Sequence, residues 1–264
     1  TDEFMDKKIS GITTEIMRDK FKNSPLVSWV FSRIVKAVHK CIVLGYIQSG
    51  KTRAIIELIH FAISYLGISV VVMIQNKTSG YVQLRERIDD FESKLSGKMI
   101  PVKYAKGIKK IHEQFEIEEG RNKPGVIISL YNTKQLKRLG DAIEDAKKKG
   151  KLAPFILITD EYDSTILSRQ DEPDEEMKRT QAVAEVIRKN SKIEIGFTAT
   201  LLGPMVSDDT TEVSNLFVMK PGENYVGFDS DRIKLVDLKK ESLFDKLNGN
   251  SIVSFASLKK IFGM

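Results

Sequence analysis

Short apolar runs rich in β-branched residues alternate with longer segments of helical periodicity through residues 40–200. The runs are continuously apolar, which is typical of strands that are covered on both faces. A chain that alternates strands and helices in this way forms a mostly parallel sheet with helices on both faces. The sequence therefore predicts an α/β fold. The runs interpreted as strands are residues 41–44, 69–74, 126–130, 155–159 and 192–197.

The rest of the chain carries a weaker pattern. We expect residues 1–38 to form a helical N-terminal lead-in and residues 39–264 to form one domain. Beyond residue 200 the pattern loosens, and only residues 232–236 are interpreted as a strand. Because the chain begins without Met and ends at Met264 without a natural-looking tail, we interpret it as a fragment of a longer protein.

Composition excludes several classes of protein. Hydrophobic residues make up 41% and charged residues 30% of the chain, as in ordinary globular proteins. No apolar run approaches the ~20 residues of a membrane helix, so we expect no membrane partner. The single cysteine, Cys41, cannot form an internal disulfide, which favours a reducing intracellular compartment. The net charge of +6 is compatible with a polyanionic partner.

A phosphate-binding pattern follows the first predicted strand. Residues 45–52 read Gly-Tyr-Ile-Gln-Ser-Gly-Lys-Thr, a full match to G-x-x-x-x-G-K-[ST]. Glycines allow backbone N–H groups to curl around a phosphate, and the following helix adds the positive end of its dipole. In this pattern the lysine reaches the β- and γ-phosphates, and the threonine hydroxyl holds Mg²⁺. The predicted nucleotide-binding residues are Gly45, Gln48, Ser49, Gly50, Lys51 and Thr52.

An acidic box follows the fourth predicted strand, where residues 160–163 read Asp-Glu-Tyr-Asp. The carboxyl end of a parallel strand faces the crevice in which ligands of open α/β sheets bind. An acidic pair at a strand end is usually only solvated, but the phosphate loop upstream needs such a partner. We expect Asp160 to bind Mg²⁺ through a water. Glu161 is expected to orient and deprotonate the water that attacks the γ-phosphate, which makes Lys51 and Glu161 the predicted catalytic residues.

A triplet of small residues, Thr-Ala-Thr at 198–200, follows the fifth predicted strand. This strand is expected to lie beside the one that carries the acidic box. Asp163 is then placed to hydrogen-bond the hydroxyl of Thr198 or Thr200. Such a bond would couple the γ-phosphate to another surface of the protein.

At these three positions the chain resembles the first RecA-like domain of superfamily-2 helicases and translocases, the DEAD-like ATPases. The phosphate loop, the D-E-x-D box and the [ST]-A-T triplet match motifs I, II and III of that family in order and context. The resemblance covers about residues 40–230. Residues 196–200 and 221–227 particularly resemble a branch found in viral and in restriction- or defence-associated proteins. The resemblance implies a RecA-like P-loop NTPase that hydrolyses ATP with Mg²⁺.

Two further segments fit the resemblance. Residues 75–78, Gln-Asn-Lys-Thr, stand where the family carries motif Ia, and Asn132-Thr133 stands near motif Ib. In the family these loops touch the backbone of DNA or RNA. The resemblance therefore implies a nucleic-acid partner and assigns contacts with it to Lys77, Thr78, Asn132 and Thr133.

The chain also departs from the family. A second RecA-like domain, which supplies an arginine finger in the family, is absent from the sequence and is the expected partner. Arginines such as Arg53, Arg85 and Arg138 lie on predicted helices of the same lobe, with no evident route to the γ-phosphate. We therefore expect the chain alone to be a weak ATPase. No Q-motif glutamine precedes the phosphate loop, so selectivity for adenine is not established.

Two alternatives to a helicase or translocase motor stay open. The ATPase domain of a viral DNA-packaging terminase also carries a phosphate loop, an acidic pair and a coupling triplet. A nucleotide-dependent, nucleic-acid-binding switch with negligible hydrolysis is the third hypothesis, although Glu161 argues against it. The cytoplasm, the nucleus and a viral factory are all reducing compartments compatible with these hypotheses.

Overall fold

The computed structural model describes residues 24–45, 50–94, 108–117, 124–166, 175–199 and 215–219. The chain divides into two units, Thr1–Tyr225 and Val226–Met264, and every described residue belongs to the first. Residues 1–23 of the predicted lead-in and the candidate strand at 232–236 lie outside the described residues. Among the described helices, none is both long and apolar enough to cross a membrane.

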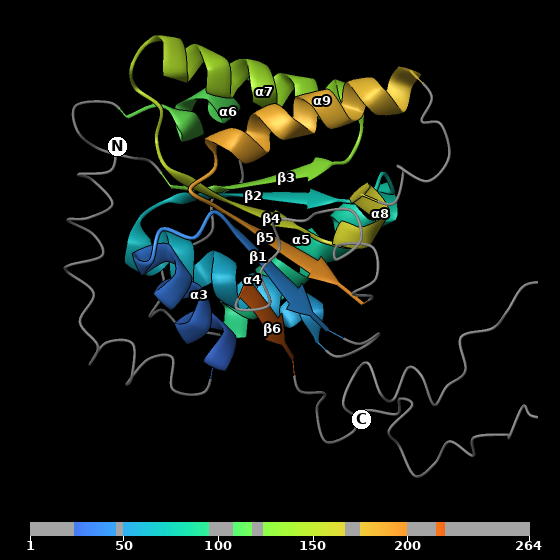
Figure 1. The fold of residues 1–264 in the computed structure, drawn as a ribbon. Coiled ribbons are helices and arrows are strands. Elements are labelled where there is room, and N and C mark those ends of the chain that lie inside the picture. Colours follow the sequence, from blue (N-terminus) through green and yellow to red (C-terminus); the bar gives the residue numbers. More distant parts are fainter. Residues whose placement is uncertain are drawn as a thin grey trace, which may run out of the picture. The chain divides into compact units, whose positions relative to one another are not determined.

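The described strands form one six-stranded sheet in which every pairing is parallel (Figure 1). Their order across the sheet is β3-β2-β4-β5-β1-β6. This arrangement confirms the predicted α/β class and the parallel sheet. The bounds are β1 (Lys40–Leu44), β2 (Ser69–Ile74), β3 (Val126–Leu130), β4 (Phe155–Thr159), β5 (Ile193–Thr198) and β6 (Leu216–Val218).

The short strand β6 was not predicted. It extends the sheet beyond β1, and the N–H of Met219 donates to the carbonyl of Leu44 over 2.8 Å. The ring of Phe217 lies 5.4 Å from that of Trp29, between centroids. Three residues are too few to show a sequence pattern, and the strand depends on these contacts with distant parts of the chain.

Three described helices and a π-helix cover one face of the sheet (Figure 1). They are α3 (Pro25–Val35), α4 (Lys51–Phe61), the π-helix η1 (Ala62–Leu66) and α5 (Thr78–Lys94). Their buried apolar residues share one core with side chains of all the strands from β1 to β5. α3 lies within the predicted lead-in, and its residues Val27 and Val30 are fully buried in this core. α3 therefore packs on the sheet.

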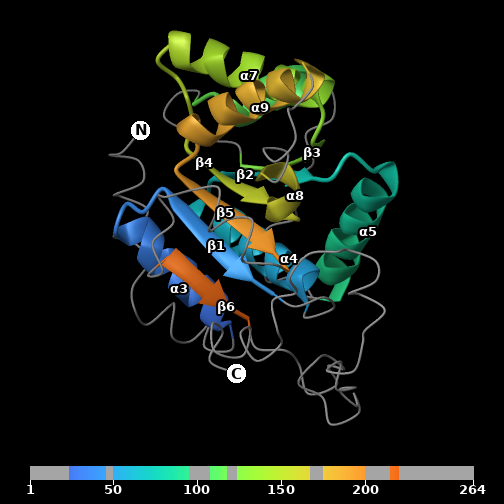
Figure 2. The same ribbon diagram turned by 45° about the vertical axis from the view of Figure 1, so that its right-hand side comes forward.

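The opposite face is covered by α6 (Ile108–Phe115), α7 (Thr133–Lys148) and α9 (Glu175–Asn190), and Figure 2 shows α7 and α9 on this face. Leu139 of α7 and Ile187 of α9 are buried in a second core with Val71 and Phe155 of the sheet. A short helix, α8 (Tyr162–Ile166), begins three residues after β4 ends at Thr159. The prediction of helices on both faces is thus confirmed.

This topology determines where a ligand can bind. Because the strands are parallel, the loops that follow them meet at one edge of the sheet. α4, after β1, and α5, after β2, cover one face, whereas α7, after β3, and α9, after β4, cover the other. In open α/β sheets, ligands bind at the carboxyl edge where successive connections change face. The predicted site residues follow these strands.

Candidate functional site

The two ends of the phosphate-binding pattern lie where a strand-loop-helix arrangement requires them. The N–H of Gly45 donates to the carbonyl of Thr198 over 2.9 Å, which ties the end of β1 to the end of β5. Gly50 precedes α4 with a φ of 89°, a left-handed conformation that glycine adopts without strain. Lys51 and Thr52 then form the first turn of α4 and are both half-buried. Residues 46–49, with the predicted Gln48 and Ser49, lie outside the described residues.

The acidic box begins directly after β4. The N–H of Asp160 donates to the carbonyl of Met73 in β2 over 2.9 Å. One carboxylate oxygen of Asp160 accepts the N–H of Glu161 over 3.0 Å. Glu161 is exposed, and its φ of 51° lies in the left-handed region. That conformation costs a non-glycine residue about 1–2 kcal/mol. Strain of this kind is concentrated at functional sites.

The carboxylate of Asp160 is perturbed by its surroundings. Burial raises its pKa, and the negative charge of Asp163 acts in the same direction. The N–H of Glu161 and the positive charge of Lys51 oppose the rise. Lys51 therefore lies close enough to Asp160 to act on its charge, which links the phosphate-loop helix to the acidic box. A partly dehydrated carboxylate is well suited to bind a cation.

A cavity of about 240 Å³ joins both predicted metal ligands to Glu161, one of the two predicted catalytic residues. Thr52, Asp160 and Glu161 line it, together with residues of α5 and of the loop before it. A larger cavity of about 620 Å³ continues along α4 and α5 and is lined by Gly50, Lys51 and Thr52 among others. The structure thus brings Lys51, Thr52, Asp160 and Glu161 together at one edge of the sheet, although they are far apart in the sequence.

Sequence reasoning missed Arg87 of α5, which contacts the phosphate-loop helix. Its Nη1 donates to the hydroxyl oxygen of Thr52 over 3.0 Å, and the arginine lines both cavities. The helical periodicity of α5 contained the signal. Arg87 stands one turn after the buried Leu84 and next to the buried Ile88, so it flanks the face of α5 that packs on the sheet.

The strand that ends at Thr198 lies beside β4, as predicted. β5 pairs with β4 on one side and with β1 on the other, so Thr198 ends a strand between the phosphate loop and the acidic box. Thr198 is fully buried and Asp163 is half-buried. The bond from Asp163 to a threonine hydroxyl stays a prediction, and Thr200 lies outside the described residues.

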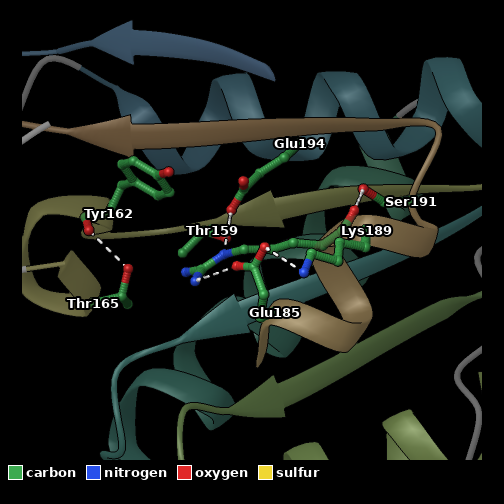
Figure 3. Close-up of polar contacts among 8 residues, drawn as sticks. Thr159, Tyr162, Thr165, Glu185, Lys189, Ser191 and Glu194 are labelled. Carbon is green, nitrogen blue, oxygen red and sulfur yellow. Dashed lines mark hydrogen bonds and ion pairs between the residues drawn. The ribbon is translucent and has the colours of Figure 1, made fainter. Parts of the chain in front are cut away.

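A buried polar network lies beneath the acidic box (Figure 3). Nε of Arg188, from α9, donates to the carboxylate of Glu194 in β5 over 2.9 Å. The hydroxyl of Thr159, the last residue before the box, donates to the same oxygen over 3.5 Å. Both charged side chains are largely withdrawn from water, with exposed fractions of 16% for Arg188 and 7% for Glu194. Together with Thr159, the pair thus connects α9, β4 and β5 directly before the acidic box begins.

Tyr162, the third residue of the box, anchors it to β5. The side chain is 2% exposed, and its ring covers Gly196 so closely that a Cβ there would lie 2.6 Å from the ring. Nζ of Lys40, from β1, lies 5.1 Å from the centre of the ring. The carbonyl of Tyr162 also accepts the hydroxyl of Thr165 over 2.8 Å (Figure 3). This packing was not predicted. Two features of the sequence pointed to it: an aromatic residue inside the acidic box and a glycine within a buried strand.

The two segments assigned to nucleic-acid contact lie side by side. Nδ2 of Asn132, in the loop after β3, donates to Oδ1 of Asn76, in the loop after β2, over 3.0 Å. Lys77 and Thr78 are exposed next to this bond. The structure therefore brings the candidate contacts together at the same edge as the cavities.

Two of those candidates have structural partners. Oδ1 of Asn132 accepts the N–H of Gln135 over 3.0 Å and caps α7. The hydroxyl of Thr133 is hydrogen-bonded to that of Thr180 in α9. These bonds explain the two residue types by helix capping and helix packing. Lys77 and Thr78 are the more accessible candidates.

The donor set at the cavity fits Mg²⁺. Proteins bind this ion through one or two carboxylates, with waters and substrate phosphates completing six ligands. Thr52 and Asp160 supply a hydroxyl and a carboxylate. No cluster of three or more His, Cys, Asp or Glu side chains arranged for a metal occurs in the described ranges.

No protein-family model and no curated protein matches the chain. Function is therefore inferred from the motifs at the carboxyl edge of the sheet and from their geometry.

Proposed function

We propose that the chain is the ATP-binding and ATP-hydrolysing domain of a superfamily-2 nucleic-acid helicase or translocase. The observation that carries this proposal is the cavity that joins Thr52, at the start of the phosphate-loop helix, to Asp160 and Glu161 of the acidic box. The effect of the Lys51 charge on Asp160 supports the same juxtaposition. An isolated phosphate loop or an isolated acidic pair would not need this arrangement.

The proposed chemistry assigns a role to each side chain. The N-terminus of α4 and Lys51 bind the phosphates, because backbone N–H groups and a cation converge there. Thr52 and Asp160 hold Mg²⁺, which neutralises charge on the phosphates. Glu161 takes the proton of the attacking water, and its exposed carboxylate at the mouth of the cavity leaves room for that water.

The nucleic-acid part of the proposal is supported by the neighbouring loops. Asn76 and Asn132 join the segments after β2 and β3, and Lys77 offers an exposed cation beside them. Nucleic acid bound at this edge would lie next to the acidic box, so the binding of ATP and the binding of nucleic acid could influence each other. We propose that a second RecA-like domain completes both sites.

The phosphate-binding role of Lys51 is tested by Lys51→Ala. A hydrogen bond to a charged group contributes about 1.5–3 kcal/mol, so the affinity for Mg²⁺-ATP should fall by about tenfold or more. The half-buried position of Lys51 at the end of a helix leads us to expect little loss of thermal stability. Calorimetric titration with ATP measures the affinity, and a thermal melt measures the stability.

The matched control is Lys137→Ala, because Lys137 is an exposed lysine of α7 on the opposite face of the sheet. It should bind ATP like the wild type. If Lys51→Ala also bound and hydrolysed ATP like the wild type, the phosphate-loop assignment would be wrong.

A further inference from the structure

We propose that Arg87 of α5 is a second phosphate-binding cation, and that it recognises the terminal phosphate of the bound nucleotide. This inference rests on the proposed function and deepens it. It concerns a residue outside the phosphate loop, the acidic box and the coupling triplet.

The position of Arg87 is the first argument. Its guanidinium donates to the Thr52 hydroxyl over 3.0 Å, so it already lies at the start of the phosphate-loop helix. The smaller cavity places it with Asp160 and Glu161, and the larger cavity places it with Gly50 and Lys51. Arg87 is therefore the cationic side chain shared by both cavities among the described residues that line them.

The topology indicates which end of the nucleotide Arg87 meets. α5 follows β2, which lies beside β4, and two strands, β4 and β5, separate β2 from the phosphate-loop strand β1. Arg87 thus approaches Thr52 from the side of the acidic box. The proposed function places the γ-phosphate on that same side, because Glu161 must reach the water that attacks it. A guanidinium there faces the terminal phosphate and lies away from the nucleoside.

The chemistry of the contact supports an exchange of partners. The Thr52 hydroxyl is the proposed ligand of Mg²⁺, and it accepts a hydrogen bond from Arg87. A cation bound at that hydroxyl would repel the guanidinium, and the guanidinium would then bind neighbouring phosphate oxygens. Planar guanidinium groups bind phosphate through two parallel hydrogen bonds, which makes arginine well suited to this role.

A purely structural role explains less. Arg87 is exposed, and a single hydrogen bond between exposed side chains contributes little to stability. Its neighbour Arg85 illustrates such a contact, since it lies 3.8 Å from Asp89 on the surface of the same helix. Arg85 is not among the described residues that line either cavity. It therefore provides a matched control on the same helix.

The test compares ATP and ADP, which differ by the terminal phosphate. Dissociation constants for both nucleotides with Mg²⁺ are measured by calorimetry on the whole chain, for wild type, Arg87→Ala, Arg87→Gln and Arg85→Ala. We expect Arg87→Ala to weaken ATP binding by about tenfold or more, as for loss of a charge-assisted bond, and to leave ADP binding within about twofold. Arg87→Gln keeps a donor for Thr52 without the charge and should behave in the same way.

Arg85→Ala should bind both nucleotides like the wild type, and thermal melts of all variants should coincide. Equal losses for ATP and ADP in Arg87→Ala, or no loss for either, would overturn this inference while leaving the proposed function in place. A wild-type chain that binds neither nucleotide would overturn the proposed function and the role of Arg87 with it. The variant Lys51→Ala separates these two failures. If it weakens ATP binding while Arg87→Ala has no selective effect on ATP, only the inference about Arg87 fails.

Discussion

The ionised carboxylate of Asp160 destabilises the folded protein. Burial raises its pKa above the ordinary value of 3.8, which means that the folded state binds a proton more tightly than the unfolded chain does. The stability of the nucleotide-free protein therefore falls as the pH rises from about 3.8 through the raised pKa, and the loss is complete above it. A bound cation would relieve this loss, since it compensates the dehydrated carboxylate.

Asp160→Asn should therefore stabilise the nucleotide-free protein at neutral pH. Asparagine removes the buried charge but keeps an oxygen for the N–H of Glu161, so the melting temperature should rise by a few degrees at most. The additional stabilisation that Mg²⁺-ATP gives the wild type should be lost in this variant. Thermal melts with and without Mg²⁺-ATP measure both effects.

Asp141→Asn, which removes an exposed carboxylate from α7, provides the control and should change neither melt. A lower melting temperature for Asp160→Asn than for the wild type would show that the charge of Asp160 is stabilising, contrary to this interpretation.

At the scale of the elements, Tyr162 and Gly196 hold α8 and the acidic box against β5. Gly196→Ala would place a methyl group 2.6 Å from the Tyr162 ring, and overpacking of this kind costs about 1–3 kcal/mol. The free energy of unfolding in urea should fall by that amount. In a Tyr162→Ala background the same substitution should cost less, because the ring that it meets is gone.

Gly80→Ala is the matched control. Gly80 lies in α5, and the nearest atom to an added Cβ is 3.8 Å away, which is ordinary van der Waals contact. Alanine suits a helix better than glycine, so this variant should be as stable as the wild type or more stable by up to about 1 kcal/mol. Equal destabilisation by both substitutions would contradict the proposed packing of Tyr162.

Local patterns predicted the main elements, but contacts between distant residues could not be predicted. Continuous apolar runs identified β1 to β5, because each strand of a covered parallel sheet must be apolar on both faces. The strand-end rule then placed Asp160 near Lys51. In contrast, the periodicity of α5 places Arg87 beside the packed face of the helix but does not name Thr52 as its partner. That bond and the pair of Arg188 with Glu194 depend on how the helices rotate and pack.

At the scale of the whole molecule, the proposed function predicts a weak motor from residues 1–264. An arginine finger contributes roughly 10³–10⁵ in rate to phosphoryl transfer, and in the resembling family it comes from the second RecA-like domain. Arg87 does not replace it, because a contact that binds the ground state and the transition state alike does not raise the turnover rate. We expect weak ATP binding, slow hydrolysis and no strand separation.

ATP turnover and duplex unwinding measure this directly, with Glu161→Gln as the inactive control. Joining a second RecA-like domain should restore stimulation by nucleic acid. Robust unwinding by residues 1–264 alone would show that one lobe is sufficient.

The place of β5 between β1 and β4 has a consequence for the dimensions of the site. Neighbouring strands lie about 4.7–4.9 Å apart, so the phosphate loop and the acidic box leave the sheet about 9–10 Å from each other. In the proposed function, Thr52 and Asp160 reach into this gap from its two sides and line the same cavity. The spacing is a property of strand order alone. Point substitutions can therefore change the groups on either side of the gap, but they leave its width unchanged.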